Sequence, residues 1–278
     1  MKLHLCSFAD SRLQESSNRL LRQATDFGCF NSIKFFDESL LDISFRKEFS
    51  EKLKPNVRGF GYWVWKPQVI LQTFAEIEKD SILLYLDVGC HLNLGGKQRF
   101  QEYIDQLQSS NNFIMATELG ASNSEKQWTK GDLLDYFSVR DNANISGSSQ
   151  IAATFSFLKK NADSIDFVQS WLSTFRHDFT LVDDTPSTSP NEPEFIEHRH
   201  DQSVFSVLSK LAGLEKISVN ETYPSSNAQA ETADGWATLK DYPIHTRRDK
   251  KFVKQPWGEK IVSRLERYGL LSNTWTRR

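Results

Sequence analysis

Asp87 occupies a position in the chain where a carboxylate can do chemistry. It follows the apolar run ILLYL at 82–86 and comes two residues before Gly89. Such a run is typical of a strand buried on both faces, as in parallel sheets. Ligands of open α/β sheets collect at the carboxyl ends of strands, where a glycine lets them approach the backbone. Asp87 is therefore a candidate for holding a divalent cation or a metal-bound diphosphate; the alternative is a carboxylate that caps the next turn.

Two further polar groups could act on a diphosphate. Lys66 stands at the start of a helical segment before the Asp87 strand, and the run His198-Arg199-His200-Asp201-Gln202-Ser203 opens a later helix. A departing nucleoside diphosphate gains negative charge, which a metal ion or Lys and Arg side chains stabilise. The sugar carbon that it leaves becomes oxocarbenium-like and needs a carboxylate or amide oxygen near its face. The alternatives are a surface lysine for Lys66 and helix capping for Asp201.

The C-terminal part of the chain is basic. Residues 240–278 contain eleven Lys or Arg and four Asp or Glu, and the run RRDKK at 247–251 has five charges in five residues. This run is either a solvated surface or a cluster that neutralises a polyphosphate. Residues 257–268 have the pattern of a short amphipathic helix, which would either pack on the domain or rest on a membrane.

The order of apolar segments predicts the elements that position these groups. Strands are expected at 2–8, 33–36, 82–87, 113–117, 150–158 and 217–219, and helices at 11–27, 44–53, 67–78, 97–108, 131–137, 162–175 and 200–211. This alternation predicts an α/β fold with a mostly parallel central sheet flanked by helices. Gly28 should end the first helix, and 183–194, rich in Pro, Ser, Thr and acidic residues, should form an exposed loop.

Size and composition limit the classes of protein. The chain has 278 residues, 38% hydrophobic and 25% charged, which suits a packed core, and we find neither a repeat nor a clear domain boundary. We expect a single domain over 1–278, with halves at 1–117 and 118–278. A net charge of −2 gives no overall attraction to nucleic acid or anionic membrane. Three cysteines without metal spacing, no secretory signal and no membrane-spanning run predict a cytoplasmic location.

The motifs, taken in order, resemble the GT-A-fold glycosyltransferases, particularly the retaining families that build lipopolysaccharide and capsule chains. Lys66 stands at their basic position, Tyr85-Leu86-Asp87-Val88-Gly89 resembles their Tyr-Leu-Asp-x-Asp strand end, and His200-Asp201-Gln202-Ser203 resembles the segment that opens their late helix. The run RGFGYWVWKP at 58–67 is similar to that of bacterial and viral polysaccharide transferases. The order agrees from about Lys2 to Trp257. One departure is clear, because the second aspartate of the pair is Gly89 here.

The resemblance implies a site for a nucleotide-sugar donor. The residues that it places there are Phe8, Asp10, Arg12, Tyr62, Trp65, Lys66, Asp87, Gly89, Arg247 and Lys251. Those after the first strand would contact the base and ribose, although Asp10 could equally be a helix N-cap. Of the neighbours Tyr62, Trp63 and Trp65, we expect at least one in the core and one at the donor pocket.

The resemblance also implies catalytic and acceptor-binding residues. Gln202 would lie on the reacting face of the donor sugar, and Asp201 would contact the sugar hydroxyls. Because an amide is a poor nucleophile, retention by a front-side mechanism fits better than a covalent intermediate; Asp201 would act as base if the enzyme inverts. Trp128, Gln150 and His200 would line the acceptor site, with core packing as the alternative for Trp128.

A divalent cation, Mn²⁺ or Mg²⁺, is implied with Asp87 and His245 as ligands. In the family a C-terminal histidine before a Lys-Pro-Trp-like segment often completes the metal site, and here His245 precedes the run KQPW at 254–257. With Gly89 in place of the second carboxylate, either water replaces the missing ligand or the basic tail neutralises the diphosphate without a metal. Both remain open.

These expectations describe a hexosyltransferase of polysaccharide biosynthesis. It would use a nucleoside-diphosphate sugar, most simply a UDP-sugar, and a glycan or glycolipid acceptor, with retention, no nucleic-acid partner and possible peripheral membrane contact through the tail. One alternative is a carbohydrate-binding or scaffold protein that has lost catalysis, motivated by Gly89. Another is a nucleic-acid-binding protein that uses the basic tail, which the net charge disfavours.

Overall fold

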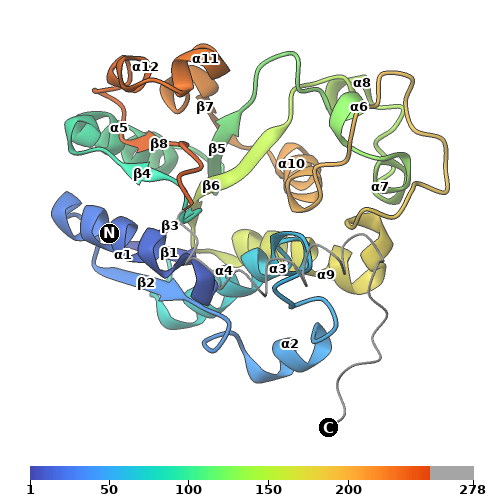
Figure 1. The fold of residues 1–278 in the computed structure, drawn as a ribbon, viewed down its shortest axis with the longest axis horizontal. Helices are drawn as coiled ribbons and strands as arrows, with labels where there is room; N and C mark the ends of the chain where they lie inside the picture. Colours follow the sequence, from blue (N-terminus) through green and yellow to red (C-terminus); the bar gives the residue numbers. More distant parts are fainter. Residues whose placement is uncertain (251–278) are drawn as a thin grey trace, which may run out of the picture.

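A six-stranded sheet forms the centre of the protein (Figure 1). The computed structural model describes residues 1–250. The strand order of the sheet is β2-β1-β3-β6-β5-β7. The strands are β1 (Leu3–Phe8), β2 (Ser32–Phe36), β3 (Ile82–Leu86), β5 (Ile114–Glu118), β6 (Ile151–Lys159) and β7 (Glu215–Ser218). β1 is parallel to β2 and β3, β5 is parallel to β7, and β6 is antiparallel to both of its neighbours. The expected mostly parallel sheet is confirmed.

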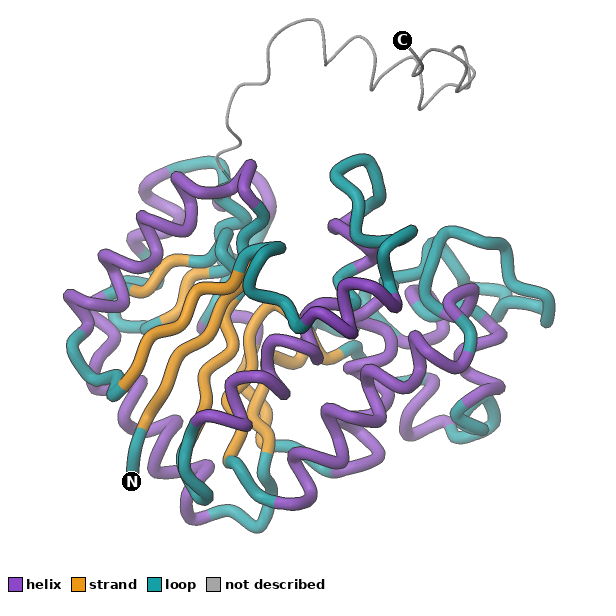
Figure 2. Tube along the Cα trace, turned by 90° about the horizontal axis from the view of Figure 1, so that it is seen from below, coloured by secondary structure: helices purple, strands orange, loops and turns teal. Residues whose placement is uncertain are grey.

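Long helices cover both faces of this sheet (Figure 2). On one face pack α1 (Gln14–Phe27) and α5 (Lys97–Ser109). On the other pack α4 (Trp65–Glu76), α9 (Ala162–His177) and α10 (Asp201–Ala212). Each has an apolar stripe that the sheet buries. Gly28 ends α1 in a left-handed conformation with φ 71°, as predicted.

Shorter elements connect these layers. The short helices are α2 (Ile43–Glu48), α3 (Gly59–Tyr62), α6 (Glu125–Trp128), α7 (Gly131–Tyr136), α8 (Ala143–Ser146), α11 (Asn227–Ala230) and α12 (Ala233–Ala237). The 3₁₀ turns are η1 (Ser11–Leu13), η2 (Leu94–Gly96), η3 (Phe179–Leu181) and η4 (Val219–Glu221). β4 (His91–Leu92) and β8 (Ile244–His245) form a separate antiparallel pair. The predicted loop at 183–194 contains neither helix nor strand.

The predicted strand before Asp87 lies in the middle of the sheet. All five residues of β3 are buried, between β1 and β6. Leu83 and Tyr85 face the core that includes α4, whereas Leu84 and Leu86 face the core that includes α1, because side chains alternate along a strand. Asp87 is the first residue beyond the strand, so the sheet fixes its position.

An unusual turn leads into α4. The five consecutive residues 59–63 all have φ between 50° and 92°. Glycine adopts this left-handed region freely, but Phe60, Tyr62 and Trp63 do so at an energetic cost. Such strain persists only where surrounding packing holds it, and it is concentrated at functional sites.

Three further predictions concern the end of the helix at 44–53, the C-terminal segment at 257–268 and membrane spans. The helix predicted at 44–53 is shorter and ends at Glu48. The amphipathic segment at 257–268 lies outside the described residues. None of the helices within 1–250 has both the length and the apolar character that a membrane span requires.

Candidate active site

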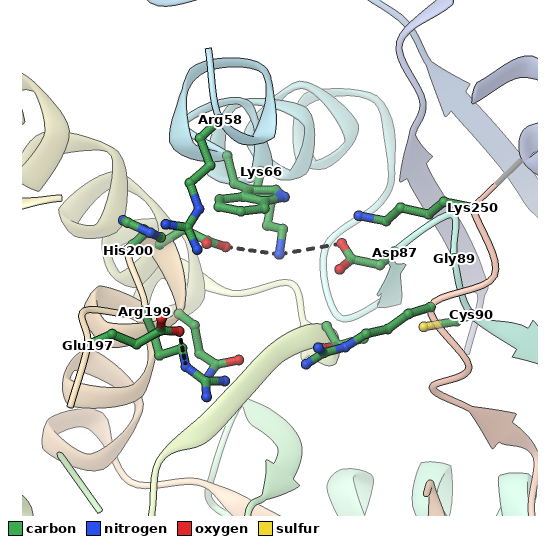
Figure 3. Close-up of a pocket in the computed structure, with 14 residues that line it drawn as sticks. Arg58, Lys66, Asp87, Gly89, Cys90, Glu197, Arg199, His200 and Lys250 are labelled. Atoms are coloured by element: carbon green, nitrogen blue, oxygen red, sulfur yellow. Dashed lines mark ion pairs between the residues drawn. The ribbon is translucent and has the colours of Figure 1, made fainter. Parts of the chain in front are cut away.

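Lys66 joins two carboxylates that are distant in the sequence. Its Nζ lies 2.9 Å from Asp201 Oδ2 and 3.4 Å from Asp87 Oδ1 (Figure 3). It also donates a hydrogen bond of 3.0 Å to the carbonyl of Ala153. Lys66 is only 4% exposed, which excludes a surface lysine. The N-cap of α10 is His200, so Asp201 does not cap the helix and its side chain is used for this pair. The structure thus brings β3, α4 and α10 together at one ammonium group.

The charges in this cluster affect one another. Burial lowers the pKa of Lys66, but Asp201 and Asp87 outweigh burial, and the net shift is upward. Burial raises the pKa of Asp201 to about 6, against the opposing effect of Lys66. Tyr85 donates a hydrogen bond of 2.6 Å to Asp87 Oδ1, and burial raises the pKa of the Tyr85 hydroxyl well above its ordinary value. Lys66 therefore stays charged and Tyr85 stays a donor at neutral pH.

These groups line a central cavity of about 310 Å³ with an excess of positive charge. Its lining contains five Lys or Arg and three Asp or Glu, namely Arg58, Lys66, Arg199, Arg248 and Lys250 against Asp87, Glu197 and Asp201. His200 also lines it, and burial lowers the pKa of this imidazole, so that it is neutral at pH 7. An excess of about two positive charges suits a ligand with two negative charges, such as a diphosphate diester.

An aromatic cavity adjoins the central one and shares Arg58, Trp63, Asp87 and Lys250 with it. The ring of Phe8 is stacked on Trp65 at 4.0 Å and 22°, and on Phe60 at 5.9 Å and 26°. Asp10 and Arg12 line the same cavity as an ion pair of 2.6 Å, and Asp10 also caps η1. Aromatic walls beside a hydrogen-bonding pair fit a nucleobase and a ribose.

A third and more open cavity adjoins the central one on another side. It has a volume of about 670 Å³ and shares Thr154, Arg199, Gln202 and Arg248 with the central cavity. Trp128 lines it, with the guanidinium of Arg199 3.8 Å from the ring centre. The three cavities therefore form one continuous cleft, which we call the aromatic, central and open cavities.

Gln202 lies where the central and open cavities meet. Its Nε2 donates to Gln150 Oε1 at 2.8 Å, and Gln150 Nε2 donates to Glu125 Oε2 at 3.0 Å. A carboxylate only accepts, so Glu125 fixes which way round the amide of Gln150 lies, and Gln150 in turn fixes Gln202. Because the Gln202 NH₂ group is engaged with Gln150, its Oε1 is the amide atom left for a ligand.

Several predicted residues do not lie where they were predicted. Gln150 is fully buried and positions Gln202, so it cannot contact an acceptor. The Tyr62 hydroxyl donates a hydrogen bond of 2.8 Å to Asp184. Trp63, and not Tyr62, lines the aromatic cavity that would serve as the donor pocket. The guanidinium of Arg247 lies 4.7 Å from the ring centre of Trp236. His200 lines the central cavity instead of the open one, and Lys251 lies outside the described residues.

The predicted metal ligands do not share a cavity. His245 belongs to β8, is 6% exposed, and donates from Nε2 to the carbonyl of Leu239 at 2.9 Å. It lines neither cavity that contains Asp87. Asp87 Oδ1 is already engaged by Tyr85 and Lys66. Within 1–250, no three His, Cys, Asp or Glu residues are grouped so that they could hold a metal ion. The donor set at Asp87 does not fit the divalent cation that the resemblance implies.

Sequence reasoning did not individually assign four positively charged residues of the cleft. Arg248 and Lys250 lie inside the basic run, between the predicted Arg247 and Lys251, and Arg58 and Arg199 belong to motifs in which other residues were singled out. The charge run and the Arg-Gly-Phe-Gly segment were the available signals. The backbone at Trp63 and Arg248 is left-handed, with φ 60° and 56°. This conformation decides which neighbouring side chains face the cleft, and the residue types alone do not reveal it.

Comparisons with known proteins give distant likenesses. No protein-family model matches the chain, and no curated protein matches it either. Among solved structures, it is similar to a glycosyltransferase involved in the glycosylation of the major capsid of PBCV-1 (14% identity, TM-score 0.47, covering 90% of this chain and 98% of that one). It is also similar to mouse xyloside xylosyltransferase 1 (10%, 0.46, 89% and 96%). A third is 4-diphosphocytidyl-2C-methyl-D-erythritol synthase from Anaerococcus prevotii (12%, 0.37, 78% and 86%). Likenesses this distant assign no activity to the chain, which has to be argued from the cleft.

Proposed function

We propose that the protein is a glycosyltransferase that moves a hexose from a nucleoside-diphosphate sugar to a glycan or glycolipid acceptor. The observation that carries this proposal is the order of the three cavities. An aromatic cavity, a central cavity with excess positive charge and an open cavity follow one another, and Gln202 lies at the second junction. This is the order of the parts of a nucleotide sugar followed by its acceptor.

The donor would lie along the first two cavities. Its base packs against the wall that Phe8 and Trp65 form, and its ribose hydrogen-bonds to Asp10 and Arg12. The diphosphate occupies the central cavity, where charge-assisted hydrogen bonds to Lys and Arg are strong because water is partly excluded. The hexose then reaches Asp201 and Gln202, and a UDP-sugar is the first donor to test.

The reaction would take place at the junction with the open cavity. The bond from the anomeric carbon to the phosphate oxygen breaks, and its electron pair stays on that oxygen. The acceptor hydroxyl oxygen bonds to the same carbon, and its proton passes to the departing phosphate. Gln202 Oε1 stabilises the oxocarbenium-like carbon. A front-side course of this kind retains configuration.

A panel of nucleotide sugars tests this proposal. We expect one donor to raise the melting temperature and to be hydrolysed slowly to the nucleoside diphosphate even without acceptor. Gln202→Ala should keep the thermal shift but lower the release rate about a hundredfold, in the range of a lost transition-state contact. Gln98→Ala, on the exposed face of α5, is the matched control and should behave as wild type.

The outcomes separate the alternatives. Donor binding without release would favour the carbohydrate-binding protein. Silence across the whole panel would contradict a nucleotide-sugar site. Use of a lipid-linked acceptor in place of a soluble glycan would bear on the peripheral membrane contact expected of the tail.

A further inference from the structure

The segment 246–250, which we call the strap, occupies the place next to Asp87 where the resemblance implies a second carboxylate. Asp249 N donates to the carbonyl of Gly89 at 2.9 Å. A Cβ on Gly89 would lie 3.2 Å from Arg248 Cα and 3.3 Å from Lys250 Cγ. These distances are tighter than ordinary van der Waals contact. Any side chain at position 89 would press on the two strap residues that face the cavity, and the strap would have to shift by a few tenths of an ångström to admit it.

Asp249 anchors the strap to the body of the protein. Arg19 Nη1 pairs with Asp249 Oδ2 at 2.9 Å and donates to its carbonyl at 2.8 Å. Arg19 Nη2 donates to the carbonyls of Val88 and Cys90, at 2.7 and 3.1 Å. His91 Nε2 lies 3.1 Å from Asp249 Oδ2. One guanidinium therefore holds the strap and the turn after β3 in a fixed relation.

This anchoring directs the two neighbours of Asp249 into the cleft. Arg248 has φ 56°, a conformation that a residue other than glycine keeps only where its surroundings enforce it. Arg248 lines the central and open cavities, and Lys250 lines the central and aromatic cavities. Figure 3 shows Lys250 pointing toward Asp87. The strap thus delivers two positive charges to opposite ends of the central cavity.

We propose that Arg248 and Lys250 take the place of the divalent cation, so that the protein binds a nucleoside diphosphate without metal. This inference rests on the proposed function. When the glycosidic bond breaks and its electron pair passes to the phosphate oxygen, the strap side chains and Lys66 neutralise the resulting charge. This proposal explains both why the donor set at Asp87 does not fit a metal ion and why residue 89 is glycine.

Titration calorimetry with the full chain tests the inference. The probes are UDP, GDP, CDP and ADP, each measured in EDTA and in Mn²⁺. We expect the diphosphate that binds to do so with the same Kd, within about twofold, in both solutions. Arg248→Ala and Lys250→Ala should each weaken binding about tenfold, the effect of one charge-assisted contact.

Arg247→Ala is the matched control, because Arg247 belongs to the same basic run but contacts Trp236 outside the cleft. It should change the Kd less than twofold. Circular dichroism melting of all three variants shows whether each is folded, and so separates lost contacts from lost folding. A folded Lys250→Ala protein that binds as tightly as wild type overturns the proposal.

The remaining outcomes distinguish this inference from the proposed function. Binding that needs Mn²⁺, with sugar transfer intact, overturns the inference and leaves the function. Metal-free binding that Lys250→Ala abolishes, without turnover of any nucleotide sugar, supports the inference and contradicts the function. Failure of all four diphosphates to bind in either solution overturns both.

Discussion

Asp201 is a buried carboxylate held against a buried ammonium group. It is 4% exposed, and its Oδ2 has the Lys66 ammonium as a close neighbour at 2.9 Å. A buried carboxylate costs free energy unless charge partners and hydrogen bonds compensate for lost water. Groups with pKa values perturbed in this way are frequent at catalytic sites.

The raised pKa of Asp201 predicts that the free energy of unfolding depends on pH. Burial raises its pKa to about 6 in the folded protein, whereas an unfolded aspartate has a pKa of about 3.9. The folded state therefore holds this proton more tightly, and the stability that it contributes is present below about pH 4 and lost as pH rises through about 6. Asp201→Asn should remove about 2 kcal/mol of pH dependence from the free energy of unfolding in urea between about pH 4 and 7. A variant whose stability changes with pH as steeply as wild type contradicts this assignment.

Glu125 acts on the reaction through two amides. If it sets the orientation of Gln150 and hence of Gln202, Glu125→Gln should lower kcat about tenfold and leave the Kd of the donor unchanged, as expected for a positioning residue. Loss of the charge also leaves Lys210, 2.7 Å away, buried without its partner, so stability will fall.

A double variant separates the two effects. Glu125→Gln with Lys210→Met removes both charges and should recover most of the stability, but not kcat. Full recovery of kcat in the double variant would show that Glu125 acts through stability alone.

At the scale of elements, the left-handed turn 59–63 shapes the wall between the aromatic and central cavities. A Cβ on Gly59, which has φ 60°, would lie 2.5 Å from the ring of Trp63. Gly59→Ala should therefore displace Trp63, lower the free energy of unfolding by about 1–3 kcal/mol, and weaken nucleotide binding. Gly120→Ala is the control, since its Cβ would meet nothing within 4 Å. Equal melting temperatures for the two variants would show that the turn is not held as described.

The strap is the second element on which the cleft depends. Gly89→Asp restores the carboxylate of the family pattern but presses on Arg248 and Lys250. We expect nucleoside diphosphate binding about tenfold weaker in EDTA, with no recovery in Mn²⁺. Tighter binding in Mn²⁺ than wild type shows would instead mean that the strap yields to a metal ion.

At the scale of the whole molecule, features that depend on local sequence were predictable. The buried run of β3, the Gly28 C-cap and the Asp10 N-cap follow from residue type and spacing. The grouping of Lys66 with Asp87 and Asp201 was predicted from chemistry, because a carboxylate at a strand end and polar groups at two helix starts could act on one diphosphate. Features set by long-range pairing were not predictable. The antiparallel direction of β6 and the pairing of His245 with His91 depend on segments far apart in the chain.

A crystal structure with a bound nucleotide sugar, grown in EDTA, tests the central claim most directly. We predict the base against Phe8 and Trp65, the diphosphate between Lys66 and Lys250, and the anomeric carbon within contact distance of Gln202 Oε1. A nucleotide sugar bound outside these three cavities, or in the reverse direction with its base in the open cavity, would contradict it.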